Sequence, residues 1–98
     1  MEFTKAIVLS ENELKSVAHS LFYYLEERYG KSVKDALNEG KISLTKLKND
    51  LEREFLFLLE SENVDMIVVL FEGVYLAFDH RKALDFADVL IKYYGLFE

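Results

Sequence analysis

The residues of this chain that could do acid–base or metal chemistry are two histidines and three pairs of carboxylates. A metal site needs several converging ligands, and neither His19 nor His80 has a facing ligand residue four positions further along a helix. The paired carboxylates are Glu26/Glu27, Glu52/Glu54 and Glu60/Glu62. Carboxylates this close on a helix point apart, whereas glycosidase or acid–base catalysis needs two that converge across a cleft. We expect neither a metal site nor a carboxylate active site.

Other catalytic patterns are missing as well. The chain has no glycine-rich phosphate loop, no nucleophile elbow and no local Ser/His/Asp set. It has no cysteine, which excludes thiol nucleophiles, disulfides and cysteine metal sites and fits a cytoplasmic location. We therefore predict a protein that is not an enzyme and needs no cofactor.

Length and composition predict one globular domain over residues 1–98. The chain is 51% hydrophobic and 31% charged, which is typical of a folded protein rather than a disordered one. Its net charge of −6 argues against non-specific binding to nucleic acid or to an anionic membrane. No apolar run is long enough to span a bilayer, and no secretory signal is seen. Abundant Glu and Lys without Gln or Cys is a thermophile tendency.

The elements follow from apolar spacing and from residues that begin or end helices. A strand is expected over residues 3–9, and Ser10 with Glu13 has the spacing of a capping box for a helix that ends at Gly30. A short helix over 32–38 precedes a third helix that Ser43 or Thr45 can cap. Asp79 caps a last helix that ends at Gly95.

Residues 66–71 and 74–78 are rich in β-branched or other apolar residues and predict a β-hairpin. Glu72-Gly73 is a weak signal for a tight turn, so we expect a longer loop with Gly73 at positive φ. One long buried helix over 63–78 is the competing interpretation.

These elements predict a small α+β domain of order β-α-α-α-β-β-α. We expect the N-terminal strand and the hairpin to form a short antiparallel sheet, covered by the first, third and fourth helices. An all-α helical bundle is the alternative.

Three runs, 55–59, 66–71 and 74–78, are apolar on consecutive residues. Such runs are covered on both sides, and a small chain has little material with which to cover both. The first functional hypothesis is therefore a protein-interaction module that forms a homodimer or binds another protein. Its expected anchors are aromatic and aliphatic residues on helices: Leu56, Phe57, Tyr94 and Phe97.

A second hypothesis is a DNA-binding regulator. The segment 32–40, with Ala36 four residues before Gly40, followed by another helix, resembles a helix-turn-helix, and a hairpin after it would complete a winged-helix outline. The resemblance implies contacts from the start of the third helix, through the bases and amide Lys41, Lys46, Lys48, Asn49 and Arg53, with Ser43 and Thr45 as phosphate donors. The later half of that helix is acidic, which opposes contact with phosphate.

The acidic balance of the chain suggests a third hypothesis, a small inhibitor that occupies a basic groove of another protein. The residues that would face such a groove are Glu52, Glu54, Glu60, Glu62 and Asp65.

Overall fold

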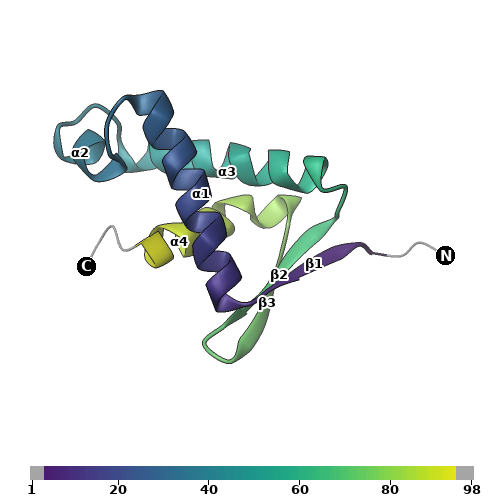
Figure 1. The fold of residues 1–98 in the computed structure, drawn as a ribbon. Helices are drawn as coiled ribbons and strands as arrows, with labels where there is room; N and C mark the ends of the chain where they lie inside the picture. The colour runs from purple at the N-terminus through teal and green to yellow at the C-terminus, as the bar shows by residue number, and fades with distance from the viewer. Residues whose placement is uncertain (1–3, 95–98) are drawn as a thin grey trace.

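The computed structural model describes residues 4–94, with the backbone alone at Tyr94, and confirms the predicted α+β fold and element order (Figure 1). The elements are β1 (Ala6–Leu9), α1 (Glu11–Tyr29), α2 (Val33–Asn38), α3 (Leu44–Ser61), β2 (Met66–Phe71), β3 (Val74–Asp79), the 3₁₀ turn η1 (His80–Lys82) and α4 (Ala83–Tyr94). The all-α alternative is wrong, because 66–79 is a hairpin and not a helix.

Several helix boundaries form where the sequence predicts them, but Asp79 caps the 3₁₀ turn η1 rather than the last helix itself, and the predicted end at Gly95 lies outside the described residues. The Ser10 hydroxyl accepts from the Glu13 amide at 3.2 Å and the Glu13 carboxylate accepts from the Ser10 amide at 3.1 Å, which completes the capping box. Gly30 ends α1 at φ 76°. Ser43, rather than Thr45, caps α3 by accepting from the Lys46 amide at 3.0 Å. Local sequence is therefore enough to place these ends.

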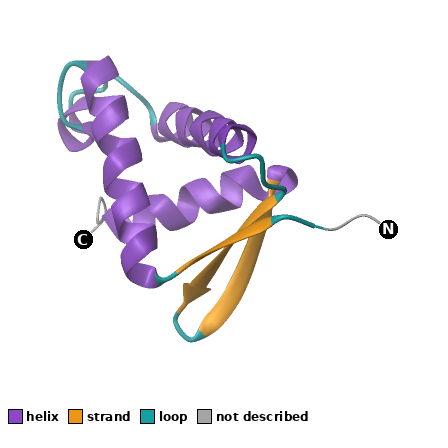
Figure 2. Cartoon of the chain, turned by 45° about the vertical axis from the view of Figure 1, so that its right-hand side comes forward, coloured by secondary structure: helices purple, strands orange, loops and turns teal. Residues whose placement is uncertain are grey.

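The sheet has the strand order β1-β2-β3. β2 and β3 pair in the expected antiparallel sense, but the prediction is wrong for β1, which pairs with β2 in parallel. The physical reason is the connection: three helices lie between β1 and β2, and a helical crossover returns the chain to the end of the sheet where it started. Figure 2 shows the helices gathered on one side of the strands.

The hairpin turn is tighter than expected. Phe71 pairs with Val74, so only two residues form the loop, and both Glu72 (φ 51°) and Gly73 (φ 81°) have the positive φ of a type I′ turn. The expectation of a longer loop is wrong. The Glu72 amide donates to the Glu11 carboxylate at 3.0 Å, a contact between residues far apart in the sequence that holds a glutamate in this conformation.

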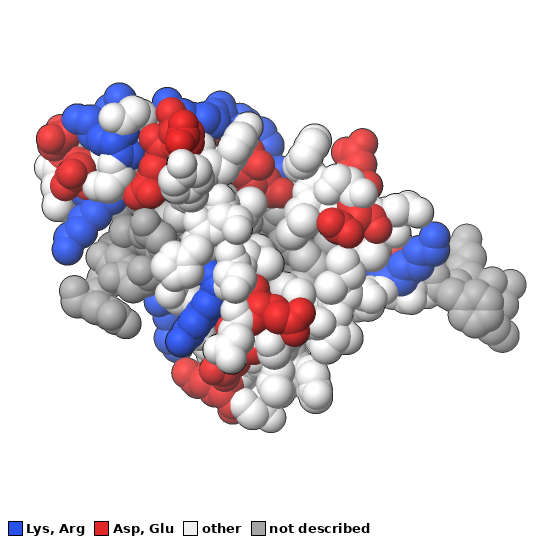
Figure 3. Space-filling view, viewed as in Figure 1, with Lys and Arg blue, Asp and Glu red and all other residues white. Residues whose placement is uncertain are grey.

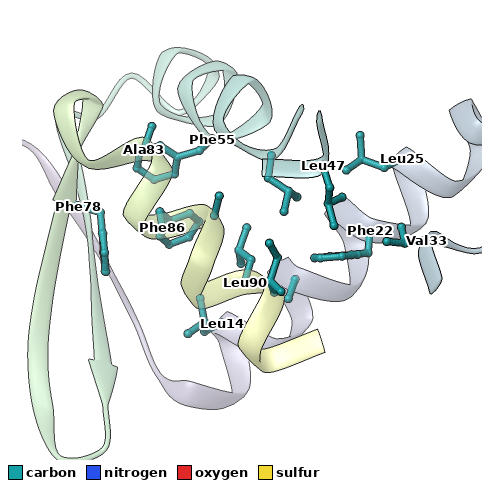
Figure 4. Close-up of a cluster of buried hydrophobic side chains, with 14 of the residues drawn as sticks. Leu14, Phe22, Leu25, Val33, Leu47, Phe55, Phe78, Ala83, Phe86 and Leu90 are labelled. Carbon is teal, nitrogen blue, oxygen red and sulfur yellow. The ribbon is translucent and has the colours of Figure 1, made fainter. Parts of the chain in front are cut away.

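The core is a chain of aromatic contacts that runs from the sheet through α4 to α3 (Figure 4). The Phe86 ring on α4 lies 5.3 Å from the Phe78 ring on β3 and 4.4 Å from the Phe55 ring on α3, measured between centroids. α1 and α4 pack directly on the sheet, and α3 packs mainly on α4. The third helix therefore forms a second helical layer rather than a direct cover for the strands, which corrects that part of the prediction.

Candidate interaction surfaces

The register of the three strands divides their residues between an inner face on the helices and an outer face. Ile67 and Phe78 pair with each other on the inner face and are buried. Side chains alternate along each strand, so the residues next to the inward-facing ones point to the outer face. They form three rows across the sheet: Ala6–Met66–Asp79, Val8–Val68–Ala77 and Leu70–Tyr75. We call these eight residues the outer sheet face.

The outer sheet face is apolar although no helix of the described residues covers it. Val8 is 60% exposed and Tyr75 is 65% exposed, Ala6 and Ala77 are also exposed, and the other four residues are half-buried. A sheet with one face in water normally carries polar residues there, whereas Asp79 is the one charged residue among the eight. Its carboxylate is paired with the Arg81 guanidinium at 3.0 Å. Figure 3 shows charged side chains crowded at the α2 end, upper left, and mainly uncharged atoms along the strands, lower right.

A groove adjoins one end of this face, where β2 begins and β3 ends. Its volume is about 800 Å³, and it lies between the C-terminal turn of α3, the loop before β2 and the start of η1. Met66 and Asp79 belong to both the groove and the outer sheet face, so the two surfaces are continuous. Leu56 and Leu59 contribute apolar walls, Glu60 and Asp65 add negative charge, and Lys5 adds one positive charge. The groove therefore combines an apolar lining with an acidic rim.

The predicted anchors on helices are only partly within the described residues. Phe57 is 66% exposed on α3, and Leu56, 38% exposed, lines the groove. The side chain of Tyr94 and all of Phe97 lie outside what the structure describes. Leu56 thus adjoins the outer sheet face, through the groove.

The lysines of the predicted DNA-binding surface are engaged with groups of the chain itself. Lys41 donates to the Tyr29 carbonyl oxygen, Lys46 lies 3.0 Å from the Asp50 carboxylate, and Lys48 lies 3.0 Å from Asp88 on α4. A contact with phosphate would have to compete with these partners.

The remaining members of that predicted surface are uncharged, apart from one arginine. Ser43 uses its hydroxyl as the cap of α3. Thr45, Asn49 and Arg53 are exposed. The structure therefore brings the basic residues to the region around the first half of α3, where two of them, Lys46 and Lys48, are paired with carboxylates.

The five acidic residues predicted to bind a basic partner do not form one face. Successive residues of an α-helix turn by about 100°, which sends the four glutamates of 52–62 in different directions. Glu54 pairs with Arg28 on α1 at 3.9 Å, and Glu52 is half-buried. Glu62 is exposed at the end of α3, and Asp65 accepts from the Lys5 amide at 2.9 Å. Only Glu60 and Asp65 meet, at the groove.

One buried polar cluster links α1 to α3. The Tyr29 hydroxyl donates to the Asp50 carboxylate at 2.6 Å, and the Lys46 ammonium donates to the same oxygen at 3.0 Å. Asp50 is 4% exposed, the one buried charged residue in the described part of the chain. Burial opposes its ionisation, but the hydrogen bonds from Tyr29 and Lys46 prevail and lower the pKa of Asp50.

Burial, reinforced by the Asp50 charge, raises the pKa of Tyr29. The tyrosine therefore stays protonated and donates, while the aspartate stays ionised and accepts. All three polar groups of this cluster are satisfied within the fold, so it acts as a structural tie between α1 and α3.

Within residues 4–94, no group of three or more His, Asp or Glu side chains could hold a metal ion. No helix in the same stretch is both long and apolar enough to cross a bilayer. Comparisons with protein-family models, with curated proteins and with solved structures find no match for the chain. Function is therefore inferred from the surfaces themselves.

The sequence predicts the apolar runs but not the surface that they create. Val8, Val68, Tyr75 and Ala77 share the outer sheet face, and none was a predicted site residue. The signal was present: in 66–71 both alternating sets of side chains are apolar, so neither face of that strand is adapted to water.

Proposed function

We propose that this protein is a non-enzymatic, cytoplasmic interaction module that forms a homodimer through the outer sheet face. The observation that carries the proposal is the apolar character of both faces of β2. Met66, Val68 and Leu70 point away from the helices as Ile67 and Val69 point toward them. Burying the outer set in a partner removes apolar surface from water, which is the main favourable term in protein association.

Charge favours a partner with the same kind of surface. Each chain carries a net charge of −6, so two copies repel each other unless they meet where charge is absent. The outer sheet face offers that place, because its only charge, Asp79, is balanced by Arg81. Two-fold symmetric dimers are the commonest way in which a chain covers such a patch.

The surface proposed here differs from the helical surface that the sequence suggested. Phe57 is as exposed as Tyr75, but it projects from a helix whose exposed face also carries charged residues. The sheet face is contiguous across three strands, and contiguous apolar patches mark interaction sites better than isolated exposed residues.

DNA binding is the weaker candidate. It requires several free cations, and Lys41, Lys46 and Lys48 already have partners within the fold. The acidic-inhibitor hypothesis is weaker still, since its five residues do not share a face.

Sedimentation velocity or light scattering over a range of concentrations tests the proposal. We expect the parent protein to be a dimer at tens of micromolar, and Val8→Lys to shift it to monomer. Phe57→Lys is the matched control, since Val8 and Phe57 are 60% and 66% exposed and neither change disturbs the core. A monomeric parent protein refutes the homodimer. A dimer that survives Val8→Lys but not Phe57→Lys refutes the sheet face as its interface.

A further inference from the structure

The outer sheet face has a projecting side chain at one end and a hollow at the other. Tyr75, 65% exposed, stands in the row nearest the hairpin turn. The groove lined by Met66 and Asp79 lies at the opposite end of the same strands. Tyr75 and Asp79 are four positions apart on β3, a distance of about 13 Å along an extended strand. The row Val8–Val68–Ala77 lies midway between them.

Building on the proposed homodimer, we infer that two copies stack face to face with their strands antiparallel, so that Tyr75 of each copy enters the groove of the other. The two-fold axis then crosses the strands at right angles over the middle row, Val8–Val68–Ala77. This operation exchanges the two ends of the face and brings each projection to a hollow. A surface with this property is complementary to a second copy of itself, which an isologous interface requires.

Electrostatics favour a two-fold axis at right angles to the strands over one parallel to them. An axis parallel to the strands would place the two grooves together, with Glu60 and Asp65 of both copies at one end and, among the described residues that line the groove, only Lys5 of each copy to offset them. Bringing like charges together at an interface is unfavourable. The antiparallel arrangement instead sets each acidic groove against the partner's hairpin turn, where Glu72 is already paired with Lys92 at 3.2 Å.

The groove also suits the chemistry of a tyrosine. Leu56, Leu59 and Met66 offer apolar contact for the ring, and the Asp79 carboxylate can accept a hydrogen bond from the hydroxyl. The hydrogen bond from the Arg81 side chain lowers the pKa of Asp79, so this acceptor is ionised at neutral pH. Tyrosine is among the residues that most often dominate binding energy at interfaces.

Cross-linking of single-cysteine variants tests the arrangement, because the parent chain has no cysteine. Under the antiparallel arrangement residue 77 lies over residue 77 of the partner and residue 8 over residue 8. We expect Ala77→Cys and Val8→Cys each to form dimers with a short bis-maleimide, and a mixture of the two to give no 8–77 peptide by mass spectrometry. Phe57→Cys, which is exposed on α3, is the control and stays uncross-linked.

Other cross-linking patterns would contradict the antiparallel arrangement or the sheet-face dimer. Cross-linked 8–77 peptides in the mixture, without 77–77 or 8–8 products, overturn the antiparallel arrangement but support the sheet-face dimer. A dimer that cross-links only through Phe57→Cys overturns both. In solution, Tyr75→Ser should raise the dimer Kd about tenfold or more, while Leu84→Ser, at an exposed apolar residue of α4, leaves it unchanged. Equal Kd values for the two variants overturn the proposed role of Tyr75.

Discussion

Replacing Tyr29 by phenylalanine removes one hydroxyl from the buried tie between α1 and α3. That hydroxyl donates to the Asp50 carboxylate at 2.6 Å, and a hydrogen bond to a charged group contributes about 1.5–3 kcal/mol. Lys46 still donates to the same oxygen at 3.0 Å, so Asp50 is not left without a partner. We therefore expect Tyr29→Phe to lower the free energy of unfolding by about 2 kcal/mol at neutral pH. For a domain with about 5–15 kcal/mol in all, that is a large fraction.

The cost should depend on pH in a defined direction. The pKa of Asp50 is lower in the folded protein than its ordinary value of 3.8. A lowered folded pKa contributes stability that is present above the unfolded value and is lost as the pH falls through the folded one. Because Tyr29 supplies part of that lowering, the cost of Tyr29→Phe should be full above pH ~4. Below it, the cost should decline toward about 1 kcal/mol, the contribution of a neutral hydrogen bond.

Urea denaturation followed by circular dichroism, at one protein concentration and at several pH values, measures this difference. Tyr24→Phe is the matched control: it makes the same chemical change on the same helix at a residue that is 50% exposed, and should alter stability by less than about 0.5 kcal/mol. A cost for Tyr29→Phe no larger than that of Tyr24→Phe, or one that is the same at every pH, would contradict the role assigned to the Tyr29 hydroxyl.

Two further changes test the core and the turn by the same denaturation assay. Phe86→Ala removes a fully buried ring that contacts Phe55 and Phe78 and should lower the free energy of unfolding by about 3–5 kcal/mol. Leu84→Ala, at an exposed position, is the control and should lower it by less than about 1 kcal/mol. Similar losses for the two variants would contradict the chain of aromatic contacts. Gly73→Ala should cost about 1–2 kcal/mol because φ is +81° there, although a Cβ would meet no atom within 4 Å; unchanged stability would mean that the turn is not type I′.

Features that depend on neighbours in the sequence could be predicted from the sequence alone. Ser10 with Glu13, and Gly30, set the ends of α1 because a capping hydroxyl or a left-handed residue acts on amides and carbonyls a few positions away. The hairpin at 66–79 followed from its β-branched and apolar residues. The order of elements, and with it the fold class, came from such local signals.

Features that depend on contacts between distant residues could not be predicted from the sequence alone. The prediction of a longer hairpin loop failed because the positive φ of Glu72 is held by Glu11, 61 residues earlier. The charge of the predicted basic surface could not be predicted for the same reason, since Lys48 pairs with Asp88 on another helix. Neither pairing can be inferred from the spacing of residues within one segment.

The same division explains the apolar runs. The sequence alone shows that β2 and β3 have too many consecutive apolar residues for one small core, since alternate side chains of a strand point to opposite faces. The position of the excess apolar residues depends on how the strands and helices pack. Parallel pairing of β1 with β2 aligns Val8 with Val68, antiparallel pairing aligns Val68 with Ala77, and α1 and α4 pack on the other side. Register is a relation between distant segments, and it brings β1 and the runs of β2 and β3 onto one apolar face, while the run 55–59 lies on α3.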